Sequence, residues 1–428
     1  MNVPAYTLVR PQPQPARTLP VGVAFALLVS IVVSRLAGSI APSPLYALYQ
    51  STWGFSSIAT TVIFGIYAIA VLVALLMVGS LSDYVGRRPV LIVALLVQIG
   101  GMALFIAASG VADLVLARII QGLSTGAAIG AVGAGLLDLN KSRGTIANAV
   151  APMTGTATGG ILSGLMIQYL PYPTHLVYGV LGVVFLVQAL GVVAMQETAT
   201  PKPGALTAIR PTIGLPPALR TPFLLVAPAL IAAWALAGFY GSLGPSLVRE
   251  VTHSRSSAVG GLALLALAGS GGVAVLAMRA LTTRTVMFIG VLGLMLGVGL
   301  TVLGSTWHSI PTYFVGTIIA GVGFGGSFQG AIRSVVPLAE PQSRAGVLSV
   351  VYIVSYLAMG VPAVGAGFRV VHGGGLLGTA REYGVAVMLL AGMALLGLLR
   401  PARSSSPVTT PATALATPAV ALVPLSRG

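Results

Sequence analysis

The sequence predicts an all-α integral membrane protein with twelve transmembrane helices, arranged as two six-helix bundles related by pseudo-twofold symmetry. Of the 428 residues, 56% are hydrophobic and only 7% are charged, with a mean hydropathy of +0.98. A soluble domain carries roughly 25% charged residues, so most classes of soluble protein are excluded. Twelve apolar stretches are long enough to cross a bilayer, and short sequences in the first six recur about 200 residues later.

The apolar stretches define the expected helices, because a bilayer core about 30 Å thick needs roughly 20 apolar helical residues per crossing. They lie at 20–46, 57–80, 89–109, 113–137, 145–169, 175–195, 222–247, 257–279, 285–305, 311–336, 345–369 and 381–400.

A polar interruption with five prolines separates the first six stretches from the last six. We therefore expect an N-terminal bundle over 20–196, a cytoplasmic linker over 197–221 and a C-terminal bundle over 222–400. Residues 1–19 and 401–428 are rich in proline and small polar residues, which predicts a disordered cytoplasmic arm and tail.

Positive charge is distributed unequally between the two sides of the predicted spans. With the N-terminus inside, sixteen of the 22 Lys and Arg lie on the cytoplasmic side, four lie outside, and Arg35 and Arg118 lie within spans. Cytoplasmic loops retain Lys and Arg, so both termini are expected in the cytoplasm. The net charge of +15 is explained by topology, and no nucleic-acid partner is expected.

The two halves are related in sequence. The recurring segments are LAG at 36–38 and 236–238, IIQG at 119–122 with IIAG at 318–321, and SR at 142–143 and 343–344. Matches in the same order at nearly one offset indicate a duplicated six-span unit with parallel topology.

The loop between the second and third spans, GSLSDYVGRRP at 79–89, carries a charged motif. It resembles the loop signature of the major facilitator superfamily, G-x-L-x-D-x-x-G-R-R/K, with Gly79, Asp83, Gly86, Arg87 and Arg88 at the defining positions. Gly86 permits a tight turn, and the two guanidiniums can bind Asp83 and helix C-termini. We expect this cluster to latch one half against the other and to release as the protein rocks; the alternative is a positively charged turn with a fortuitous Asp.

The fourth span resembles a second signature of the same superfamily, R-x-x-q-G-x-x-x-a/g. Arg118 and Gln121 share one helical face, and Gly122 and Gly126 form a ridge for close helix packing. A guanidinium inside a membrane normally faces a cavity or a partner. The alternative is a structural arginine bonded to carbonyls of a neighbouring helix.

The fifth span keeps Gly155, Gly159 and Gly160 of the G-P-x-x-G-G element that is typical of exporters, and we expect these glycines to serve helix packing. Thr156 replaces the proline, which weakens the assignment to the multidrug and metabolite exporter branch.

The resemblance implies that spans 1, 4, 7 and 10 line a central cavity. Arg35 and Arg118 correspond to Ala235 and Thr317 in the second half, which predicts a cationic N-terminal wall and a neutral, aromatic C-terminal wall. The expected substrate-binding residues are Arg35, Ser39, Arg118, Gln121, Trp234, Phe239, Tyr240, Phe324, Phe328, Gln329, Tyr352 and Tyr356. For any single aromatic side chain, helix packing or lipid contact is the alternative.

All seven acidic residues fall in predicted loops or at span ends. A buried arginine stays protonated and can bind an anion where charge is weakly screened. The substrate is therefore expected to be a small molecule that is anionic or carries an anionic group.

The leading hypothesis is a secondary active transporter in the lipid bilayer of a bacterial cytoplasmic membrane, working as a monomer by rocker-switch alternating access. Efflux and proton coupling are expected from the resemblance; an importer, a uniporter or an anion exchanger is the alternative. A receptor or embedded enzyme is disfavoured, because the chain has no Cys, no H-E-x-x-H and no G-x-S-x-G motif. No cofactor or metal is expected.

Overall fold

The computed structural model describes residues 18–205, 209–254 and 256–399. The predicted arm at 1–19 and tail at 401–428 lie outside these residues, except for 18 and 19. Throughout the described residues, the regular secondary structure is helical. This agrees with the all-α class that the composition predicts.

The helices of the first half begin and end close to the predicted span limits. They are α1 (Val21–Ile40), α2 (Pro42–Trp53), α3 (Ser57–Val78), α4 (Ser82–Val85), α5 (Arg87–Ala107), α6 (Val111–Leu139), α7 (Lys141–Tyr169) and α8 (Pro173–Val193). The first predicted span corresponds to α1 and part of α2, and α4 is a single turn in the motif loop.

The second half repeats this order. It contains α9 (Pro217–Ser242), α10 (Gly244–Thr252), α11 (Ser257–Ala277), α12 (Thr283–Thr306), α13 (Ile310–Val335), α14 (Arg344–Arg369) and α15 (Gly375–Leu399), with short turns at Met278–Ala280, Val336–Leu338 and Val370–Gly374.

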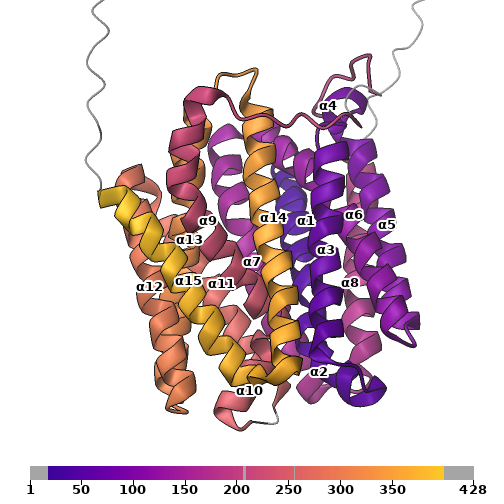
Figure 1. Ribbon diagram of the computed structural model, residues 1–428. Coiled ribbons are helices and arrows are strands. Elements are labelled where there is room, and N and C mark those ends of the chain that lie inside the picture. The colour runs from indigo at the N-terminus through magenta and orange to yellow at the C-terminus, as the bar shows by residue number, and fades with distance from the viewer. Residues whose placement is uncertain (1–17, 206–208, 255, 400–428) are drawn as a thin grey trace, which may run out of the picture.

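Eleven helical segments among the described residues are long and apolar enough to cross a membrane. One of them, Arg344–Leu399, has 56 residues, more than twice what a single crossing needs. His372 and Gly373 leave helical dihedral angles inside it, so α14 and α15 meet at one end of the molecule in Figure 1 as two crossings. The segments therefore provide twelve crossings, as the sequence predicts.

Helices α7, α9 and α15 begin four to six residues earlier than predicted, and local chemistry explains the first two. Helix α7 starts at Lys141 because the Asn140 side chain accepts a hydrogen bond from the Arg143 backbone N–H at 2.9 Å, as a good N-cap does. Helix α9 starts at Pro217, because proline is pre-organised for the first helical position.

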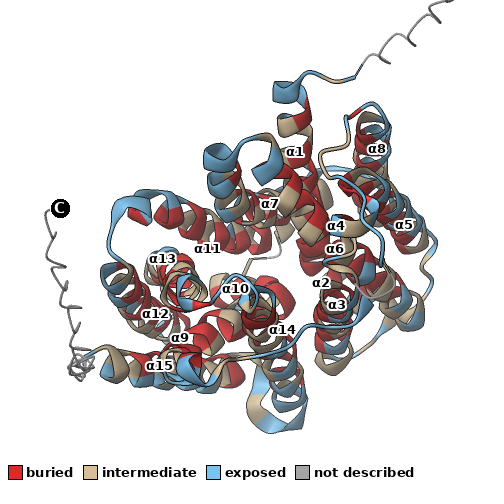
Figure 2. Ribbon diagram, turned by 90° about the horizontal axis from the view of Figure 1, so that it is seen from above, coloured by how far each residue is buried: buried red, intermediate tan, exposed pale blue. Residues whose placement is uncertain are grey.

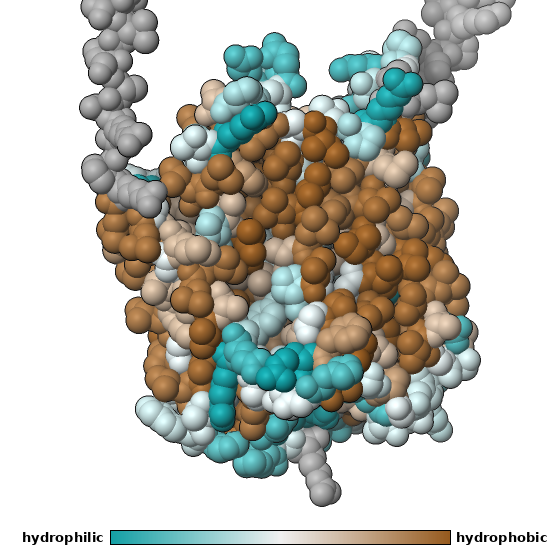
Figure 3. Space-filling view, viewed as in Figure 1, coloured by the Kyte–Doolittle hydropathy of each residue, from teal (hydrophilic) through white to brown (hydrophobic). Residues whose placement is uncertain are grey.

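The helices form two bundles with a seam between them. Seen from above in Figure 2, α1–α8 lie on one side and α9–α15 on the other, with α7 beside α11 and α3 beside α14. Buried hydrophobic side chains form one large cluster in each half, and Trp234 packs against both. The outer surface in Figure 3 is mostly hydrophobic between two hydrophilic ends, as a bilayer requires.

The predicted packing glycines lie where helices approach closely. A Cβ on Gly126 would lie 2.3 Å from the Val71 carbonyl oxygen on α3, and one on Gly159 would lie 2.4 Å from the Ala37 Cα on α1. The other predicted glycines make similar contacts: Gly122 with Ala70, Gly155 with Val33, and Gly160 with Leu264 of the second half.

Candidate functional site

The charged motif lies at the end of the molecule that carries the connection between the halves, residues 194–216, which we call the linker end. Arg87, the first residue of α5, donates to Asp83 and, at 2.8 Å, to Ser82 Oγ. Its Nε donates to Asp138 Oδ2 at 3.3 Å. Arg87 therefore joins the motif loop to the end of α6, and Gly86 makes the intervening turn with φ of 102°.

Glu197 is a member of this cluster that the sequence analysis missed. Its Oε1 accepts a hydrogen bond from the Arg87 N–H at 2.8 Å, and its Oε2 accepts one from the Arg88 N–H at 2.9 Å. The backbone N–H groups of Thr198 and Ala199 donate to Oε1 at 3.0 Å each. A carboxylate from the beginning of the linker thus caps the N-terminus of α5, where unpaired N–H groups favour negative charge.

The position of Glu197 also explains why the motif has a glycine at residue 86. A Cβ on Gly86 would lie 2.6 Å from Glu197 Oε2, so a larger residue would displace the carboxylate. Partial burial raises the pKa of Glu197, but the four backbone donors outweigh burial and lower the pKa below its usual value. The only signal in the sequence was an acidic residue directly after a span.

Two further bonds hold the same region together. Arg88 donates to the Val193 carbonyl oxygen at the end of α8, and Lys202 N–H donates to the Tyr84 carbonyl oxygen at 2.8 Å. The motif loop and the first linker residues therefore form one hydrogen-bonded unit.

A polar hollow of about 580 Å³ opens beside this unit. It is lined by Asp83, Arg87 and Asp138 of the first half, by Lys202 and Arg210 of the linker, and by Ala345 at the start of α14. At the opposite end, which we call the far end, the halves touch: Ser43 Oγ donates to the Gly241 carbonyl oxygen. A Cβ on Gly367 of α14 would also lie 2.1 Å from Thr61 Oγ1 of α3.

Arg118 is fully buried, and each of its three guanidinium nitrogen atoms has a hydrogen-bond partner. Its Nη1 donates to the Ser39 carbonyl oxygen at 2.6 Å and to Gln121 Oε1 at 2.7 Å. Its Nε donates to Tyr46 Oη at 3.0 Å, and its Nη2 donates to the same oxygen atom. The guanidinium also lies 5.1 Å from the centre of the Tyr67 ring. One of these hydrogen bonds goes to a carbonyl oxygen of the neighbouring helix α1, and the others go to side chains.

Arg35 is buried, at 2% exposed, but only partly paired. Its Nη1 donates to Ser124 Oγ at 2.9 Å, and Ser124 Oγ donates to the Ala94 carbonyl oxygen at 2.6 Å. Its Nε and Nη2 have no hydrogen-bond partner among the described residues. Although all seven acidic residues are described, none pairs with Arg35 or Arg118.

Five of the predicted aromatic residues come together at the seam. The Trp234 ring lies 6.1 Å from Phe324, 5.3 Å from Phe328 and 5.4 Å from Tyr356, centre to centre. Tyr352 continues the cluster at 6.5 Å from Tyr356. The indole N–H of Trp234 is buried and has no hydrogen-bond partner in the described part of the chain.

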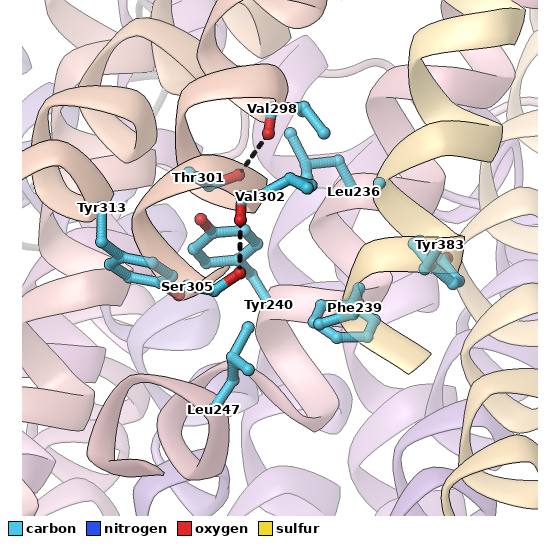
Figure 4. Close-up of a pocket in the computed structure, with 12 residues that line it drawn as sticks. Leu236, Phe239, Tyr240, Leu247, Val298, Thr301, Val302, Ser305, Tyr313 and Tyr383 are labelled. Atoms are coloured by element: carbon cyan, nitrogen blue, oxygen red, sulfur yellow. Dashed lines mark hydrogen bonds between the residues drawn. The ribbon is translucent and has the colours of Figure 1, made fainter. Parts of the chain in front are cut away.

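Phe239 and Tyr240 lie elsewhere, inside the second half. The Phe239 ring lies 4.8 Å from that of Tyr383, and Tyr240 Oη lies 2.9 Å from Thr317 Oγ1. Figure 4 shows both residues at a small cavity of about 30 Å³ between α9, α12, α13 and α15. At about 100° per residue, positions five and six after Trp234 point to other sides of α9.

The remaining predicted polar residues bond within the protein. Gln121 Nε2 donates to the Gly38 carbonyl oxygen at 2.9 Å, and Ser39 Oγ donates to Leu36 of its own helix at 2.9 Å. Gln329 Nε2 donates to the Val275 carbonyl oxygen at 3.3 Å, and its Oε1 is buried with no partner among the residues that the structure describes.

Tyr67 on α3 was also missed, although a tyrosine within an apolar span is a signal in the sequence. The centre of its ring lies 5.1 Å from the Arg118 guanidinium, and it belongs to the same buried cluster as Tyr356 of the second half.

The family model of the Major Facilitator Superfamily matches residues 23–363. The chain belongs to the Major Facilitator Superfamily. It is therefore a multi-pass membrane transporter, and the superfamily that its motifs resemble is confirmed. No curated protein sequence matches the chain.

Solved structures show the same fold. The nucleoside transporter NupG, in a mutant form, has a TM-score of 0.66 and 12% identity over 89% of this chain and 98% of its own. A bacterial homologue of the human lysosomal transporter Spinster, in an inward-facing and occupied conformation, has a TM-score of 0.68 and 12% identity. The match covers 88% of this chain and 96% of the homologue. The human organic anion transporter MFSD10 has a TM-score of 0.61 and 18% identity. The match covers 90% of this chain and 100% of MFSD10. At these identities, the likeness shows the fold alone.

Proposed function

We propose that this transporter moves a small organic anion, or a solute that carries an anionic group, by rocker-switch alternating access. The observation that carries the proposal is Arg35, a buried guanidinium with two unpartnered nitrogen atoms. Arginine stays protonated in proteins, and an unpaired buried charge costs several kcal/mol. An anionic solute would offset that cost.

The surroundings support an anion rather than a cation. Arg35 and Arg118 lie in the interior of the first half without an ion pair, and all seven acidic residues are at least partly exposed. The aromatic cluster around Trp234 offers an apolar surface for the organic part of the solute. MFSD10, which has the same fold, is described as an organic anion transporter.

The contacts between the halves support a rocking motion. The halves touch at the far end through Ser43 and Gly241, whereas a hollow separates Asp83 from the start of α14 at the linker end. In the proposed cycle, the far-end contacts break as the linker end closes. Asp83 then approaches the N-terminus of α14, which favours a carboxylate.

The orientation is proposed from the distribution of Lys and Arg, and the direction and coupling are proposed from the family resemblance. We propose a monomer in a bacterial cytoplasmic membrane with both termini in the cytoplasm, working in efflux and coupled to protons. Anion exchange or uniport is the second candidate. It is favoured by one observation: none of the seven acidic residues is buried, so no carboxylate in the interior is available to carry a coupled proton.

The test is transport by purified protein in liposomes, with organic anions, an organic cation and a nucleoside as solutes. We expect flux of one or more anions, reduced at least tenfold in Arg35→Ala. Arg143→Ala, which removes an exposed arginine at the linker end, is the matched control and should leave flux unchanged.

Equal anion flux in Arg35→Ala and the parent protein would refute the role of Arg35, and transport of the cation or nucleoside alone would refute the substrate class. Imposing a pH gradient separates the coupling candidates. Proton coupling requires a rate that follows the gradient, whereas exchange requires an anion on the opposite side.

A further inference from the structure

The two unpartnered nitrogen atoms of Arg35 lie on the same edge of its guanidinium group. Nε and Nη2 form the fork that matches the two oxygen atoms of a carboxylate. The third nitrogen, Nη1, is held by Ser124 Oγ, which is itself bonded to the Ala94 carbonyl oxygen. Helices α5 and α6 therefore fix the orientation of the group and leave this edge unpaired.

A second arginine in the chain shows what this edge binds. Arg369 Nε donates to Glu382 Oε2 at 2.8 Å, and Arg369 Nη2 donates to Glu382 Oε1 at 2.7 Å. The same two nitrogen atoms that lack partners in Arg35 thus hold a carboxylate through two parallel hydrogen bonds in Arg369.

A second buried polar side chain near Arg35 also lacks partners. Gln98 on α5 is completely buried, and neither atom of its amide has a hydrogen-bond partner among the described residues. The Gln98 amide nitrogen lies 3.8 Å from the Cβ position of Gly38, one turn after Arg35 on α1. An ionised carboxylate, which only accepts hydrogen bonds, complements the unpaired donors of Arg35 and the Gln98 amide nitrogen.

We propose that the Nε–Nη2 edge of Arg35 binds a carboxylate group of the transported solute, and that Arg118 does not contact the solute. The proposal rests on the proposed function, whose substrate class it narrows from organic anions to carboxylates. Arg118 is excluded because each of its three nitrogen atoms already has a partner within the protein.

The experiment measures binding by thermal stabilisation of the purified full-length protein. The probes are acetate, benzoate and indole-3-acetate, compared with methanesulfonate and benzenesulfonate, whose charge is the same but whose head group is not planar. We expect at least one carboxylate to stabilise the protein and to bind roughly tenfold or more tightly than its matched sulfonate. This comparison needs no variant.

Variants then locate the site. Arg35→Lys keeps the charge but removes the two-donor edge, so carboxylate binding should weaken roughly tenfold or more, as expected for loss of a bidentate pair. Arg35→Gln should behave similarly. Arg143→Lys makes the same change at an exposed arginine and should bind as the parent protein does.

Three results would overturn the assignment. The first is carboxylate binding that is unchanged in Arg35→Lys, the second is that no carboxylate stabilises the parent protein, and the third is that the sulfonates bind as tightly as the carboxylates. In each case, continued transport of another organic anion would leave the proposed function standing. Transport of a nucleoside or cation without any anion would remove both proposals.

Discussion

Replacing Glu197 tests whether the connection between the halves is part of the charged motif. Glu197→Ala removes the acceptor of four backbone N–H groups, two of which belong to Arg87 and Arg88 at the N-terminus of α5. Glu197→Gln keeps an oxygen for Arg87 but places an amide N–H₂ opposite the Arg88 N–H. Glu197→Gln therefore loses one of the four hydrogen bonds, whereas Glu197→Ala loses all four, and comparing their stabilities separates the two effects.

The magnitude follows from the bonds to α5. A hydrogen bond to a charged group contributes about 1.5–3 kcal/mol, and Glu197 is only partly buried, which reduces the value. The bonds to Thr198 and Ala199 are local and contribute less. We expect Glu197→Ala to lower the free energy of unfolding by about 2–4 kcal/mol and Glu197→Gln by about 1–2 kcal/mol.

The assay is thermal unfolding in detergent. With a shift of about 2–4 °C per kcal/mol for a unit of 150–250 residues, Glu197→Ala should lower the Tm by about 4 °C or more. Glu340→Ala, which removes an exposed carboxylate at the same end, should leave the Tm unchanged. Equal Tm values for Glu197→Ala and Glu340→Ala would refute the argument.

The pH dependence gives an independent check. The pKa of Glu197 is lowered in the folded protein, so its contribution is present above the ordinary pKa of a glutamate. It is lost as the pH falls through the lowered value. The Tm difference between the parent protein and Glu197→Gln should therefore shrink below about pH 4.

Three further changes test the packing around the site. Gly86→Ala would force an alanine to adopt φ of 102° and would place its Cβ 2.6 Å from Glu197 Oε2. It should therefore lower the free energy of unfolding by about 1–3 kcal/mol. Gly179→Ala, whose Cβ would meet nothing within 4 Å, is the control in the same Tm assay. Arg118→Lys cannot reproduce the bonds of a guanidinium and should lower the Tm through a loss of about 2–4 kcal/mol; an unchanged Tm would argue against a structural role. Ser43→Ala removes a hydrogen bond between the halves at the far end. Thr61 is buried there and the chain has no cysteine, so a Thr61→Cys variant carries a single thiol. Adding Ser43→Ala to that variant should speed its labelling by a maleimide.

Most of the fold was predictable from the sequence, because each feature depends on local chemistry. A crossing needs about 20 apolar residues, so the spans could be read from composition alone. The motif loop likewise contained its own glycine turn and its own ion pair between Asp83 and Arg87. The start of α7 was missed because the N-cap at Asn140 outweighed the weak hydropathy of the residues that follow.

The candidate site was only partly predictable, because its partners are far apart in the chain. Glu197 lies 110 residues from Arg87, and no local pattern indicates that pairing. The aromatic residues were predicted as one wall, but the rotation of α9 separates Trp234 at the seam from Phe239 and Tyr240 in the interior of the second half.

The sequence by itself determined that this chain spans a membrane as two related halves and carries two arginines within its spans, because hydropathy, charge and repeats are properties of short segments. Only the tertiary structure decided that every guanidinium nitrogen atom of Arg118 has a partner and that Arg35 keeps an edge unpaired among the described residues. Whether a donor is satisfied depends on which acceptors the neighbouring helices bring within about 3 Å, and helix rotation and packing set that distance.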